Sequence, residues 1–205
     1  MNSKVREISM GDIKSALEIA MEKVSKMEEP TEEEKLQWKY VPEGEKLAGR
    51  YLKEKVNLLA ELNNYDEKVR KFIISGASGI LARNISLPIN DHVKQNNKKA
   101  MDGLKVIKKD KVAVENLFSK IRYIFNHYEE QGAQQKKQAY ESLKADLGAK
   151  IQQALQQQMS PMMGAKIDVE KQPQFQQEWR KIQQQIDNQY ISHLNEYIRE
   201  LIDIP

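Results

Sequence analysis

The feature that most constrains this chain is the regular spacing of apolar residues near its C-terminal end. Over residues 174–202, an apolar or aromatic side chain recurs at every third or fourth position: Phe175, Trp179, Ile182, Ile186, Tyr190, Leu194, Tyr197 and Leu201. This spacing places all of them on one face of an α-helix, as in the seam of a coiled coil. The segment is therefore predicted to be one long helix that buries a single narrow stripe.

A second long helix is predicted just before it. Residues 133–158 repeat the same pattern with Tyr140, Leu143, Leu147, Ile151, Ala154 and Leu155. Each helix would be about 40 Å long, and matched lengths with single stripes favour an antiparallel helical hairpin over 131–205. Of the 19 glutamines in the chain, 17 lie from residue 131 onward. Such neutral amides suit a solvated helix surface, or a face that packs on another chain.

The remaining sequence is also predicted to be helical. The chain holds only 9 glycines and 6 prolines, and it lacks the regular turn signals of a sandwich or barrel. Apolar periodicity predicts helices over 12–27, 31–40, 43–63, 66–86, 91–108 and 111–130. We expect Pro42 to end the second of these, and a break near Val56 in the third. The predicted fold is all-α, with a compact helical body over 1–130 and the long hairpin over 131–205.

Composition excludes several kinds of site. The chain has no cysteine, which rules out disulfides, thiolate metal sites and cysteine nucleophiles. No apolar run approaches the roughly 20 residues that cross a bilayer, and the N-terminal residues lack the apolar region of a signal peptide, so a cytoplasmic location is expected. Of the three histidines, His193 has a carboxylate, Glu196, one helical turn later, but two ligands are too few for a structural metal site. No catalytic residue, metal or cofactor is predicted, and we do not expect an enzyme.

The small-residue segment SGASG, Ser75 to Gly79, superficially resembles a phosphate-binding loop. It matches neither that motif nor a nucleophile elbow, and its apolar flanks continue a helical stripe. Close approach of two helices at small side chains is the favoured interpretation. An enzyme that binds a phosphate or cofactor here is a third hypothesis, for which Ser75, Ser78 and Arg83 would be the first residues to test.

Charge is unevenly distributed, although the net charge of +3 does not itself imply nucleic acid. Residues 94–122 carry nine basic and three acidic side chains, whereas residues 22–45 carry four basic and eight acidic. Lys94, Lys98, Lys105 and Lys109 share one helical face and could neutralise phosphates. Nucleic-acid or ribosome binding through these lysines is therefore an alternative function. A solvated lysine face, or pairing with the acidic region of the same molecule, would remove this signal.

Two stretches resemble the ends of a family of uncharacterised bacterial proteins. They are IKSALEIAMEKVSKM, residues 13–27, and KQPQFQQEWRKIQQQIDNQYISHLNEYIREL, residues 171–201. The family's order is an amphipathic opening helix, a helical middle and a closing glutamine-rich helix introduced by a QP-x-F-x-x-E-W-type run. The resemblance covers most of the chain and implies an all-helical, cytosolic protein. It implies no activity, ligand or site residue.

The preferred functional hypothesis is a non-catalytic interaction or assembly module with the hairpin as its contact element. A two-helix hairpin has a high ratio of surface to core, so it is marginal unless it docks on the body, a protein partner or a second copy. The hairpin also holds more aromatic residues than a two-helix seam needs. The predicted partner-binding residues are Phe175, Trp179, Tyr190 and Tyr197.

Overall fold

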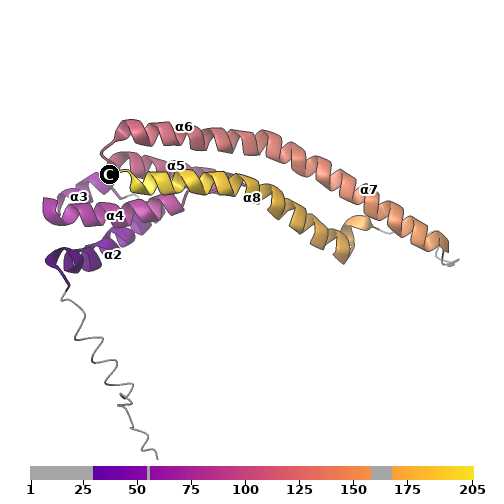
Figure 1. Cartoon of the computed structure of the whole chain (residues 1–205), viewed down its shortest axis with the longest axis horizontal. Coiled ribbons are helices and arrows are strands. Elements are labelled where there is room, and N and C mark those ends of the chain that lie inside the picture. The colour runs from indigo at the N-terminus through magenta and orange to yellow at the C-terminus, as the bar shows by residue number, and fades with distance from the viewer. Residues whose placement is uncertain (1–29, 55, 158–167) are drawn as a thin grey trace, which may run out of the picture.

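The computed structural model describes residues 30–54, 56–157 and 168–205, and every regular element in these ranges is a helix (Figure 1). The predicted all-α class is therefore confirmed, whereas the helix predicted over 12–27 lies outside the described residues. The elements are α2 (Glu32–Lys53), α3 (Leu58–Asn63), α4 (Glu67–Arg83), α5 (Asp91–Ile107), α6 (Lys111–His127), the π-helical turn η1 (Tyr128–Gly132), α7 (Ala133–Gln157), the 3-10 turn η2 (Val169–Lys171) and α8 (Pro173–Asp203).

The first described helix corrects one prediction. Thr31 and Glu34 form a capping box at its start, but α2 then continues through Pro42 to Lys53. A proline fits helical φ angles although it removes one backbone donor and crowds the preceding turn. Here the turns beyond the proline are held by packing, because Gly44, Leu47 and Ala48 are all buried. Tertiary packing therefore outweighs the local effect of Pro42, and the helix predicted to end there ends at Lys53. The break predicted near Val56 lies between α2 and α3.

The contact between α2 and α4 is made backbone to backbone. A Cβ atom on Gly76 would lie 2.1 Å from the carbonyl oxygen of Val41, and one on Gly44 would lie 2.0 Å from that of Ile73. Neither position can carry a side chain without moving the helices apart. This confirms close helix approach as the role of the small-residue segment, with Gly76 rather than Gly79 at the contact, since a Cβ on Gly79 would meet nothing within 4 Å.

Helices α2, α3, α4, α5, α6 and α8 all contribute side chains to the body's core. Leu81, Leu104, Ile121 and Leu201 come from α4, α5, α6 and α8 in turn, and each is fully buried. The C-terminal half of α8 is thus part of the body's core, and burial of such side chains contributes about 1.5–3 kcal/mol each. None of the helices formed by the described residues is long and apolar enough to cross a bilayer.

Beyond the body, α6, η1 and α7 form one unbroken rod (Figure 1). The composition change near Gly132 coincides with a π-helical turn, not with a break in the chain. The division into domains at residue 130 stays a prediction. α7 and the N-terminal half of α8 run side by side away from α2, α3 and α4 (Figure 1) and contact each other. We call the described residues 133–157 and 173–189 the arm.

Candidate binding cleft at the base of the arm

The predicted aromatic residues of α8 are packed within the chain. The Tyr140 ring meets Phe175 and Trp179 edge-on, at centroid distances of 5.2 and 5.1 Å. Nearer the body, Tyr190 packs edge-on against Tyr128 at 5.2 Å. Such edge-to-face pairs add about 0.5–1.5 kcal/mol beyond their burial. The hairpin was predicted to hold more aromatic residues than a two-helix seam requires. These residues pack α7, η1 and α8 against one another.

Burial separates the four predicted partner-binding residues into two pairs. Phe175 is 0% exposed and Tyr190 is 9% exposed, so the chain's own atoms cover both. Trp179 and Tyr197 are half-buried, and the ammonium of Lys120 lies over the Tyr197 ring. In this conformation only Trp179 and Tyr197 present surface to a second molecule. Their contact with a partner stays a prediction.

The arm itself has a very thin core. In α7, Leu147 is the one buried side chain among the described residues, and in the part of α8 that belongs to the arm it is Phe175. By contrast, α6 alone buries five side chains. Two-helix structures with so little buried apolar surface are weakly stabilised.

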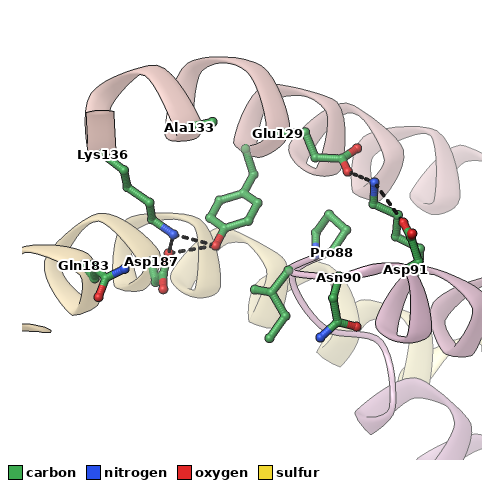
Figure 2. Close-up of a pocket in the computed structure, with 11 residues that line it drawn as sticks. Pro88, Asn90, Asp91, Glu129, Ala133, Lys136, Gln183 and Asp187 are labelled. Carbon is green, nitrogen blue, oxygen red and sulfur yellow. Dashed lines mark hydrogen bonds and ion pairs between the residues drawn. The ribbon is translucent and has the colours of Figure 1, made fainter. Parts of the chain in front are cut away.

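A polar cleft of about 670 Å³ opens where the arm meets the body (Figure 2). Its walls come from the N-terminal end of α5, from η1 with the start of α7, and from α8. The lining residues are Pro88, Ile89, Asn90, Asp91, Lys94, Tyr128, Glu129, Ala133, Lys136, Gln183 and Asp187. The volume lies within the range of small-molecule binding sites in proteins.

One wall of the cleft is a three-residue network of hydrogen bonds. The Lys136 ammonium donates to the Tyr128 hydroxyl at 2.7 Å and pairs with the Asp187 carboxylate at 2.6 Å. The Tyr128 hydroxyl donates to the same carboxylate oxygen at 2.9 Å. Figure 2 shows Lys136 of α7 and Asp187 of α8 pointing toward each other. Because Lys136 and Asp187 are 22% and 29% exposed, this pair is better shielded than a surface salt bridge.

The other wall carries a second ion pair. Lys94 of α5 bridges Glu129 of η1 and lies 3.9 Å from Asp91 (Figure 2). Hydrogen bonding to Glu129 outweighs desolvation and raises the pKa of Lys94. Both ammonium groups of the cleft are thus already matched by carboxylates of the chain.

Two groups of the cleft, Tyr128 and Lys136, have pKa values shifted away from neutral pH. Burial raises the pKa of Tyr128 above its ordinary value. Burial acts to lower the pKa of Lys136, but the hydrogen bonds to Asp187 and Tyr128 outweigh it and raise this pKa. A general base must be able to lose its proton near the working pH, and these shifts move both groups further from that range.

Two of the four lysines predicted to bind nucleic acid are engaged within the molecule. Lys94 is paired as described, and Lys105 contacts Glu115 at 3.1 Å. Lys98 and Lys109 are exposed. The four side chains therefore do not form one uniformly available basic stripe, and binding of a phosphate backbone by them stays a prediction.

Three other lysines of the basic stretch interact with the ends of helices. Lys99 donates to the carbonyls of Leu52 and Glu54 at the end of α2, both at 3.0 Å. Lys108, only 3% exposed, donates to Ile202 and Ile204 at the end of α8. Lys111 likewise donates to carbonyls at the end of α5. Cations at helix C-termini satisfy exposed carbonyls and complement the helix dipole, which explains much of the positive charge in this segment without invoking a ligand.

The remaining sequence candidates do not converge. Ser78 is buried whereas Ser75 and Arg83 are exposed, so they share no single surface. The His193 ring nitrogen lies 3.8 Å from Glu196, and both side chains are exposed. Across the described ranges, no three histidine, cysteine, aspartate or glutamate residues are grouped as metal ligands.

The fold and the cleft thus define an all-α protein with a thin-cored arm and an ion-paired pocket at its base. The chain belongs to a family of unknown function, DUF6657, whose sequence profile matches residues 59–203. This confirms the predicted membership of a family with no assigned activity. The matched region contains the whole described arm and every residue that lines the cleft. No curated protein and no solved structure matches the chain significantly.

Proposed function

We propose that this protein is a non-catalytic interaction module whose arm binds a protein partner or a second copy of the chain. The observation that supports this most is the thin core of the arm, in which Leu147 and Phe175 are the buried side chains of the described residues. Helices held by so few contacts gain stability when another surface covers them. The half-buried Trp179 lies on this arm and supplies an aromatic side chain, a type enriched in protein interfaces.

The arm's surface chemistry supports the same proposal. Most of the chain's glutamines lie here, and neutral amides can be desolvated at an interface at a lower free-energy cost than charges. Hydrogen bonds from Lys136 to the Tyr128 hydroxyl and from that hydroxyl to Asp187 connect both helices of the arm to η1 at its base. A partner would therefore meet a pre-positioned pair of helices, so less conformational entropy would be lost on binding.

A shortened arm provides the test. Removing everything after residue 130 would also remove the body's own core residues Leu194 and Leu201. Instead, residues 144–172 are replaced by a Gly-Asn-Gly-Asn turn, which can span the about 8–10 Å between packed helix axes. This variant keeps Tyr140, Phe175 and Trp179 in place.

Light scattering and low-salt co-purification are then compared for the full chain and the shortened variant. We expect the full chain to form a larger species, alone or with a partner, and the shortened variant to lose it while its melting transition stays cooperative. An identical mass and identical co-purifying proteins for both chains would contradict the proposal.

A further inference from the structure

A small pocket of about 270 Å³ lies between α6 and α8 and shares none of the residues that line the cleft. Two of the chain's three histidines line it. His127 is the last residue of α6, and His193 lies on α8 beyond the arm. Both side chains are exposed, so a ligand can reach them from solution. We call this the two-histidine pocket.

A side chain of α8 holds the first imidazole in place. The Nδ1 atom of His127 lies 3.0 Å from the Tyr190 hydroxyl, and the centroids of the two rings are 5.7 Å apart. Tyr190 stands three residues before His193, and residues at that spacing are neighbours on a helix surface. The turn of α8 that carries His193 therefore lies beside His127.

In each ring, Nδ1 faces an oxygen atom and Nε2 does not. A carboxylate oxygen of Glu196 lies 3.8 Å from Nδ1 of His193, as the Tyr190 hydroxyl faces Nδ1 of His127. Neither Nε2 atom makes a hydrogen bond with any residue that the structure describes. Histidines that bind metal ions direct their second ring nitrogen at an oxygen acceptor, which orients the ring and fixes its tautomer. Both histidines of the pocket have this arrangement.

The lining of the pocket selects one class of ion. None of the described residues that line it is an aspartate, glutamate, lysine or arginine. Ca²⁺ and Mg²⁺ are bound mainly by carboxylates and other oxygen ligands, and an anion would need a cationic side chain. Imidazole nitrogens are the strongest electron-pair donors available here, and they suit Cu²⁺, Ni²⁺ and Zn²⁺.

We propose that the two-histidine pocket binds a divalent transition-metal ion through the Nε2 atoms of His127 and His193. Gln189 also lines the pocket, four residues before His193 on α8, and its amide oxygen is the third ligand. Water completes the coordination. A mixed set of nitrogen and oxygen ligands favours Cu²⁺ or Ni²⁺ over Zn²⁺.

The number of ligands sets the kind of site. Among the described residues, no three histidine, cysteine, aspartate or glutamate side chains are grouped around an ion. We therefore expect a site that exchanges its ion with solution, not a structural site with four protein ligands. Both imidazoles lie outside the arm, so this proposal stands or fails independently of the arm's function.

The test titrates the untagged full chain, freed of metal by a chelator, with CuCl₂ alone and follows binding by isothermal titration calorimetry. MgCl₂ is the control ion. His127→Phe removes the ring nitrogens but keeps an aromatic ring between Tyr123 and Tyr190, and His193→Ala removes the second imidazole. His92→Ala is the matched control, because His92 is also exposed but does not line the pocket.

We expect one Cu²⁺ ion per chain, a loss of at least about tenfold in affinity for His127→Phe and for His193→Ala, and an unchanged affinity for His92→Ala. Electron paramagnetic resonance of the Cu²⁺-loaded chain should show coupling to two imidazole nitrogens, and to one in each pocket variant. Tyr190→Phe removes only the hydroxyl that positions His127, and loss of such an outer partner should weaken binding by about 10–100-fold.

Melting temperatures measured without metal verify that the variants fold. An absence of saturable Cu²⁺ binding would overturn the proposal. Wild-type affinity in either pocket variant, an equal loss of affinity in His92→Ala, or Mg²⁺ binding as tight as that of Cu²⁺ would overturn it as well.

Discussion

At the residue scale, single atoms decide how closely α2 and α4 can pack. Gly76 has no Cβ, and the space that a Cβ would need is occupied by the backbone of Val41. The same small-residue segment contains Gly79, where a Cβ would meet nothing within 4 Å. One helix therefore carries two glycines, of which one makes a tertiary contact and the other only lowers helix propensity.

Alanine at these two positions should have opposite effects. Gly76→Ala forces two backbones apart, and we expect a loss of about 1–3 kcal/mol in the free energy of unfolding. Gly79→Ala should gain up to about 1 kcal/mol, because alanine is the better helix former. Chemical denaturation monitored by circular dichroism compares the two, and equal stability of both variants would show that α2 and α4 are not in backbone contact.

The hydroxyl of Tyr128 gives a pH-dependent prediction. Burial raises its pKa in the folded chain above the ordinary 10.0, so from about pH 10 the folded state binds more protons than the unfolded state. The free energy of unfolding then falls as pH rises. Tyr128→Phe loses two hydrogen bonds and should be less stable by about 1–3 kcal/mol at neutral pH. Because it has no phenol at this position, its free energy of unfolding should not show this fall at alkaline pH.

The difference in the free energy of unfolding between the wild-type chain and Tyr128→Phe, here called the stability gap, should therefore become smaller from about pH 9.5 to pH 11. Melting curves across that range measure the gap. Tyr123→Phe, which removes an exposed phenol, is the matched control and should follow the wild-type profile. A constant gap for Tyr128→Phe would mean that burial does not hold this phenol in its protonated form.

At the element scale, the π-helical turn η1 accommodates one extra residue between α6 and α7. A π turn holds more residues than an α turn, so the extra residue does not change which face of α7 meets α8. Deleting the exposed Gln131 should convert η1 to an α turn. Tyr140 would then keep its contacts with Phe175 and Trp179, and Lys136 would stay on the same helix face as Tyr128.

The expected result is unchanged Trp179 fluorescence and unchanged near-ultraviolet dichroism in the deletion variant. Trp38, which is 65% exposed, contributes the same background to both proteins. Gln131→Ala keeps the chain length and should behave as the wild type. A red shift of Trp179 fluorescence in the deletion variant would show that the extra residue of η1 sets which face of α7 meets α8.

The same scale shows what the sequence predicts well. Helix positions followed from apolar period and end signals, as for α5, predicted at 91–108 and found at Asp91–Ile107. The prediction that a helix ends at Pro42 was wrong, because packing of the turns after this proline outweighs its local effect. The cleft was not predicted, because Lys136 and Asp187 lie 51 residues apart and periodicity does not show which helices become neighbours. A π turn leaves no periodic trace either.

At the scale of the whole molecule, stability is unevenly distributed. The body shares a core among α2, α3, α4, α5, α6 and α8, and the buried Lys108 ties the C-terminal end of α8 to the turn after α5. The arm relies on a few aromatic contacts and the ion pair at its base. Elements with few buried contacts open most easily, and in this chain the element with the thinnest core is also the one proposed to bind.

The central claim is that another chain covers the arm, and site-specific photo-cross-linking in the cells that make the protein tests it most directly. A photoreactive residue is placed at Gln138 or Gln153 on the exposed surface of the arm, and, as controls, at Lys46 or Lys68 on the exposed surface of the body. The account predicts a discrete cross-linked product from the two arm positions and none of that mass from the body positions. Arm positions that yield no product, or the same products as the body positions, would contradict it.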